Sequence, residues 1–141
     1  MIKLGGNDMF LSFLNEREGK LFLELANIAM NVDGEVVEGE RTAFHNYKVE
    51  LGLQDYVLQN KSYKDVVMAF QGSKKNVLRA IIVEIGGVLD ADGKIDVDEE
   101  NWLTTLGKEW GFKELEIKKL IRWIQEFNDL LEEGYNLINK R

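Results

Sequence analysis

Carboxylate side chains gather at two Asp-Gly turns, one in each half of the chain. The first turn lies in the segment VDGEVVEGE (32–40) and the second in ADGKIDVDEE (91–100). Hard divalent cations bind through carboxylate and carbonyl oxygens, and calcium takes six to eight of them. The turns therefore predict a site for calcium or magnesium. Its candidate ligands are Asp33, Glu40, Asp90, Asp92, Asp96 and Glu99.

The second turn matches the calcium loop of EF-hand proteins only in part. With Gly93 in the place of the invariant loop glycine, Glu99 takes the twelfth position and Val88 takes the first. The first turn, aligned by Gly34, begins at Ala29. Because both loops lack the first oxygen ligand, the pattern argues against an ordinary calcium sensor.

The acidic turns also have a purely structural interpretation. Residues 90–100 hold six acidic side chains against Lys94 and so carry five of the chain's seven net negative charges. Solvation, basic neighbours or a bound cation could each offset their repulsion. Acidic side chains at a helix N-terminus interact favourably with the helix dipole, and Asp96 and Glu99 have the spacing of a capping box. The alternative is therefore that the turns serve only as helix caps.

The elements that carry these turns are helices. Apolar residues recur with a period near 3.6, and the chain of 141 residues contains no Pro to interrupt them. The stripe in 74–89 is wide enough for a central, largely buried helix. We expect an all-α, compact multi-helical bundle in one domain, 1–141. The predicted helices are 16–31, 37–51, 63–70, 74–89, 97–110 and 113–138.

Turn, acidic and apolar positions repeat along the chain at one offset. Asp33 and Asp92, Glu40 and Glu99, Gly52 and Gly111, and Leu53 and Phe112 are all 59 positions apart. This spacing predicts an internal duplication of a helix-turn-helix unit, with repeat 1 at about 20–60 and repeat 2 at about 79–119. A C-terminal helix follows at about 113–138.

The helices that precede the two turns are expected to cross near the centre of the bundle. Gly86 and Gly87 lie inside the second of them, where each glycine costs about 1 kcal/mol relative to alanine. A close helix crossing against Ala26 and Ala29 would offset that cost, and the alternative is a local irregularity in the helix.

The two turns resemble the Asp-Gly-x-(Ile/Val)-x-x-x-Glu turn of the tellurite-resistance TerB-like family, which includes the TerB-like region of DnaJ-like co-chaperones. The motif positions are Asp33, Glu40, Asp92 and Glu99, and the resemblance covers about residues 20–125. It implies a helical bundle with an internal duplication. For function, it implies a bacterial stress-associated module that binds a metal or another protein.

Other residue types narrow the function further. The chain has no Cys, and its one histidine, His45, lies inside a predicted helix with no recognisable catalytic spacing, so we expect no enzyme. A net charge of -7 disfavours nucleic acid as a partner. No apolar run is long enough to span a membrane and no signal-peptide pattern is present, so a cytoplasmic location is expected.

Two functions of different class are left. The first is a stress-associated domain that binds a divalent cation at its acidic turns. The second is a helical adaptor that binds another protein and uses the turns only as caps.

Overall fold

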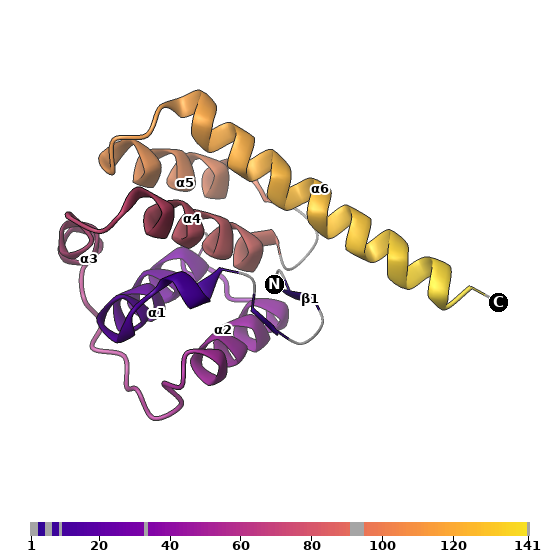
Figure 1. Cartoon of the computed structure of the whole chain (residues 1–141), viewed down its shortest axis with the longest axis horizontal. Coiled ribbons are helices and arrows are strands. Elements are labelled where there is room, and N and C mark those ends of the chain that lie inside the picture. The colour runs from indigo at the N-terminus through magenta and orange to yellow at the C-terminus, as the bar shows by residue number, and fades with distance from the viewer. Residues whose placement is uncertain (1–2, 5–6, 9, 33, 91–94, 141) are drawn as a thin grey trace.

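The described part of the chain is built from helices (Figure 1). The structure is a computed structural model, and it describes residues 3–4, 7–8, 10–32, 34–90 and 95–140. This architecture confirms the all-α class predicted from the sequence. Its elements are β1 (Lys3–Leu4), β2 (Asn7–Asp8), the 3₁₀ helix η1 (Leu11–Phe13), α1 (Glu16–Met30), α2 (Glu38–Glu50), α3 (Tyr63–Ala69), α4 (Lys75–Leu89), α5 (Val97–Glu109) and α6 (Glu114–Ile138), with β1 and β2 paired antiparallel.

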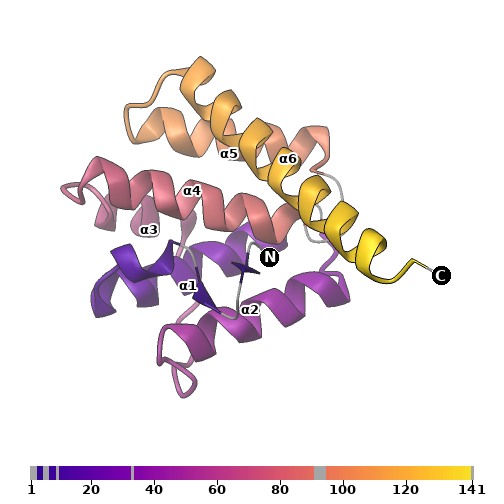
Figure 2. The ribbon, with the colours of Figure 1, turned by 45° about the vertical axis from the view of Figure 1, so that its right-hand side comes forward.

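Helix α4 forms the centre of the bundle, as its wide apolar stripe predicts. Twelve of its fifteen residues are buried, including Ile81, Ile82 and Ile85. It packs against α1, α2, α5, α6 and η1. Figure 2 shows α4 lying between α1 and α2 on one side and α5 and α6 on the other. Because α4 is apolar around most of its circumference, its neighbours must surround it.

The two helix-turn-helix segments have equal lengths and a constant spacing. The bounds of α1 and α4 differ by 59 at both ends, and so do those of α2 and α5. Gly52 follows α2 with a φ of 70°, and Gly111 follows α5 with a φ of 90°. Glycine adopts such left-handed conformations without strain and commonly ends helices in this way. These matches agree with the predicted duplication, which itself stays a prediction.

Helices α1 and α4 pack against each other, but the prediction for Gly86 was wrong. A Cβ atom added at Gly86 would collide with the Ile124 side chain of α6. An added Cβ at Gly107 would lie 2.5 Å from Cδ1 of Ile117, also on α6. Both glycines therefore allow α6 to approach α4 and α5 closely, and Gly86 does not serve the crossing with α1.

Helix α6 extends well beyond the helices that it packs against (Figure 1). Its 25 residues span about 38 Å. Ile117, Ile121 and Ile124 are buried against the bundle, whereas none of residues 125–140 is buried. The helix continues without a break through Gly134. No helix in the described ranges combines the length and the apolar composition needed to cross a membrane.

Candidate functional site

The second acidic turn contains the capping box that the sequence predicts. Helix α4 ends at Leu89 with Asp90 as its C-cap, and Asp96 is the N-cap of α5. The Glu99 N–H donates to Oδ1 of Asp96 at 2.8 Å, and the Asp96 N–H donates to Oε1 of Glu99 at 3.1 Å. Each carboxylate thus satisfies one backbone N–H that the first turn of a helix leaves without a partner.

The first acidic turn uses its glutamate in the same way. The Val37 N–H donates to Oε1 of Glu40 at 3.0 Å at the start of α2. Glu40 is 4% exposed and Glu99 is 5% exposed. Two carboxylates at equivalent positions are therefore buried and hydrogen-bonded to the backbone at the start of their helices. Both glutamates therefore contribute a hydrogen bond at the start of their helix.

Asp90 joins the C-terminal end of α4 to α6. Nδ2 of Asn128 donates to Oδ2 of Asp90 at 2.6 Å, and Asp90 is buried. A hydrogen bond to a buried carboxylate is stronger than one between neutral groups. This role of Asn128 could not be predicted from the sequence, because an Asn within an amphipathic helix carries no signal of a distant partner.

The predicted cation ligands are only partly placed by the structure. Asp33 and Asp92 lie outside the described residues. Among the residues that are described, no three or more His, Cys, Asp or Glu side chains are grouped so that they could hold a metal ion. Glu40 belongs to the first turn and Asp90, Asp96 and Glu99 to the second. The cation site stays a prediction.

A buried carboxylate on α1, Glu24, holds the segment between α2 and α3. It is 1% exposed, and its oxygens accept hydrogen bonds from the Tyr56 hydroxyl at 2.5 Å, the Gln59 N–H at 2.8 Å and the Lys61 N–H at 3.2 Å. Glu24 is not among the residues predicted to form a site, because it falls between Leu21 and Leu25 in an apolar stripe. The only feature of the sequence that indicates a buried, hydrogen-bonded carboxylate here is a Glu within an apolar stripe.

The surroundings of Glu24 and Tyr56 determine which of the two side chains is ionised. Burial raises the pKa of Glu24, but the hydrogen bonds from Gln59, Tyr56 and Lys61 outweigh it, so the pKa lies below its ordinary value. Burial, together with the hydrogen bond to the Glu24 carboxylate, raises the pKa of Tyr56 to about 12. At neutral pH, Glu24 is ionised and Tyr56 is a neutral donor.

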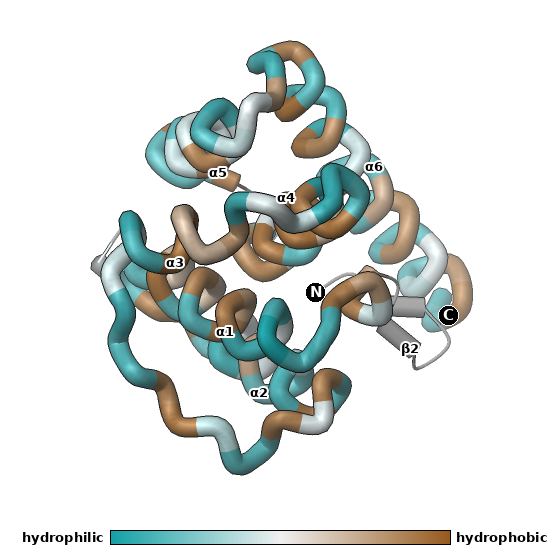
Figure 3. The backbone as a smooth tube through the Cα atoms, turned by 60° about the vertical axis from the view of Figure 1, so that its left-hand side comes forward, coloured by the Kyte–Doolittle hydropathy of each residue, from teal (hydrophilic) through white to brown (hydrophobic). Residues whose placement is uncertain are grey.

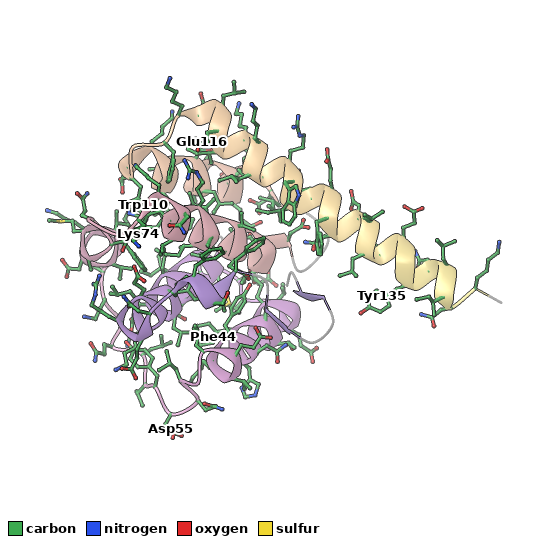
Figure 4. All side chains as sticks on the ribbon, viewed as in Figure 1. Phe44, Asp55, Lys74, Trp110, Glu116 and Tyr135 are labelled. Atoms are coloured by element: carbon green, nitrogen blue, oxygen red, sulfur yellow. The ribbon has the colours of Figure 1, made fainter. Side chains whose placement is uncertain are left out.

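The second candidate site is apolar and lies on the extended part of α6. We call it the apolar face of α6. Leu130 is 66% exposed, Tyr135 60% and Ile138 80%. Figure 4 shows Tyr135 on the part of α6 that lies away from the other helices. The apolar face of α6 consists of Phe127, Leu130, Leu131, Gly134, Tyr135 and Ile138.

An apolar groove of about 280 Å³ adjoins this face at the junction of η1, α4 and α6. The Trp123 ring stacks on Phe127 with 5.2 Å between ring centroids and meets Phe10 edge-on at 5.9 Å. Trp123 therefore joins the groove to the apolar face. The groove is lined by Phe10, Phe13, Asn76, Arg79, Ala80, Val83, Leu120 and Trp123. Figure 3 shows apolar residues recurring along the tube of α6 as far as its C-terminal end.

Comparison of this chain with protein-family models, with curated proteins and with solved structures found no match. The fold and the two sites define it as an all-helical domain with capped acidic turns and an uncovered apolar helix face. The resemblance to the TerB-like family stays a prediction.

We expect Glu24→Gln to lower the free energy of unfolding by about 2 kcal/mol at pH 7, because the hydrogen bonds to a charged acceptor are lost. The pKa of Glu24 is lower in the folded state than its ordinary value of 4.5. The stabilisation by the ionised Glu24 carboxylate is therefore present above about pH 4.5, and it is lost as the pH falls through the pKa of Glu24 in the folded state. Urea unfolding followed by circular dichroism between neutral and acid pH measures both effects.

Glu16→Gln is the matched control for this change, because Glu16 is an exposed residue of the same helix. We expect its effect on stability to be much smaller. A stability difference between wild type and Glu24→Gln that does not shrink in acid would contradict the assigned role of the Glu24 carboxylate.

Proposed function

We propose that this chain is a non-enzymatic adaptor that binds protein through the apolar face of α6. The observation that carries the proposal is the exposure of Leu130, Tyr135 and Ile138 on a helix that extends past its own bundle. Large contiguous apolar patches are rare on monomeric proteins and mark surfaces that bind something. Proteins also commonly recognise one another by binding the apolar face of a helix.

The hydrogen bonds at the acidic turns support this proposal. Glu40, Asp96 and Glu99 each have an oxygen bound to a backbone N–H, so their presence is explained by helix stability. Substitution at an N-cap typically costs about 1 kcal/mol. The resemblance of the turns to the TerB-like family adds an association with bacterial stress to the proposal.

The proposal is tested by photo-crosslinking in the cells that produce the protein. A benzophenone amino acid replaces Leu130 on the apolar face, and the same amino acid replaces Asn136 on the opposite face as the control. We expect irradiation to give protein adducts larger than the 16.2 kDa chain from position 130 and few from position 136. Mass spectrometry of the adducts identifies the protein that covers the face.

Equal crosslinking from both positions, or no adduct from position 130, would contradict an adaptor function of this face. Both positions are exposed in the structure, so the two variants differ in the face that they probe and not in accessibility.

Binding of calcium or magnesium at the acidic turns is the second candidate function. The observation in its favour is that Asp90 caps the helix before residues 91–94 and Asp96 caps the helix after them, with Glu99 three positions further on. A cation there would offset the repulsion among these carboxylates. Its candidate ligands are those named above, Asp33, Glu40, Asp90, Asp92, Asp96 and Glu99.

Thermal unfolding with calcium or magnesium tests this candidate, because a ligand that binds only the folded state raises the melting temperature. Asp96→Asn keeps an N-cap residue of equal quality but removes a charge from the candidate site. A cation site predicts a metal-dependent rise that Asp96→Asn reduces and the control Asp98→Asn leaves unchanged. No thermal shift and no heat on titration of the metal-free protein would exclude the site.

A further inference from the structure

The apolar residues of α6 continue one pattern from the bundle into the extended part. Positions spaced alternately by four and three residues form a seam, the arrangement found in helices that pair with other helices. Ile124 is fully buried within the bundle, whereas Ile138, two heptads later on the same seam, is 80% exposed. The seam thus continues beyond the part of α6 that the other helices cover. Its members are Leu120, Ile124, Phe127, Leu131, Gly134 and Ile138.

The positions that flank the exposed seam carry no charge. They are Asn128, Leu130, Tyr135 and Leu137. In paired helices, these flanking positions hold the charges that select a partner of opposite sign. Because these positions are neutral, they give the seam no electrostatic preference for a strongly basic or strongly acidic partner helix.

The charged residues of the extended part lie on the other side of α6. They are Glu126, Asp129, Glu132, Glu133 and Lys140, and this side is net acidic. Amphipathic helices that lie on membranes carry Lys and Arg on the polar face, because lipid surfaces are often anionic. The charge on α6 has the opposite sign, which disfavours a lipid surface.

The exposed end of α6 gains little stability from its own bundle. Helices of fewer than about 12 residues are marginal in water without tertiary contacts, and an interior glycine such as Gly134 costs about 1 kcal/mol more. A Cβ atom added at Gly134 would meet nothing within 4 Å. The glycine therefore leaves open space on the seam for the side chain of a partner.

We propose that the occupant of this face is the same face of a second copy, with residues 127–138 of the two α6 helices packed antiparallel. In that register, Leu131 of one copy lies opposite Gly134 of the other, and Phe127 lies opposite Ile138. A parallel pair would place glycine opposite glycine and leave a gap. The proposal rests on the interaction role of this face given above, and it specifies the partner.

The charge and the area of the face both fit a second copy. Antiparallel pairing keeps the two bundles, each part of a chain with a net charge of -7, at opposite ends of the contact. Five large apolar side chains offer on the order of 500 Å² per copy, or about 1,000 Å² for the pair, which is near the lower limit for a specific interface. The dimer is therefore weak and depends on concentration.

Analytical ultracentrifugation of the purified full chain tests the proposal over a range from about 1 to about 500 μM. We expect the mean mass to rise from 16.2 kDa towards twice that value as concentration increases. Leu131→Glu, which introduces a charge into the seam, should weaken association at least tenfold. Asn136→Glu adds the same charge on the opposite face and should leave association unchanged.

Circular dichroism and urea unfolding establish that both variants fold, as expected because Leu131 and Asn136 lie outside the buried core. A wild-type chain that stays monomeric throughout, or two variants that weaken association equally, would overturn the pairing. Co-sedimentation of the monomer with anionic phospholipid vesicles would overturn it in favour of a lipid surface. A monomeric chain whose position 130 still crosslinks to a different protein would overturn the pairing and leave the adaptor function standing.

Discussion

The burial of α4 is the constraint on which the rest of the structure depends. A helix with apolar residues around most of its circumference is stable in water only when other helices surround it. Helices α1, α2, α5 and α6 all contact α4, and Gly86 lets Ile124 of α6 lie directly on its backbone. The position of α6 follows from this contact. Because α6 is longer than α4, its last turns have no helix of the bundle beneath them (Figure 2).

Several carboxylates of the described residues accept hydrogen bonds from backbone N–H groups and so stabilise helix ends and a connecting segment. Glu40, Asp96 and Glu99 cap α2 and α5, and Glu24 holds the segment before α3 through two backbone N–H groups and the Tyr56 hydroxyl. Buried carboxylates are costly without such partners. These four carboxylates therefore stabilise the start of α2, the start of α5 and the segment before α3, whether or not a cation also binds near the acidic turns.

Local signals predicted most of the helices, because helix periods and caps depend on neighbouring residues. The range 97–110 matches α5, and the Asp96 and Glu99 capping box follows from a spacing of three. Contacts between distant residues carried no such signal. Gly86 was predicted to pack against α1, because Ala26 and Ala29 of that helix are small. The side chain that packs on Gly86 is instead Ile124, 38 positions further on. The bonds of Glu24 to Tyr56 and of Asp90 to Asn128 were missed for the same reason.

The role of the apolar face of α6 is tested most directly by amide hydrogen exchange at low and high protein concentration. Residues 114–124 pack on the bundle and should be protected at both concentrations. Residues 130–138 lie beyond the contacts of Phe127 and Asn128 with the bundle. They should exchange rapidly when dilute and become protected when concentrated, because a second copy then covers them. Exchange in 130–138 that is independent of concentration would contradict the pairing of two copies through this face.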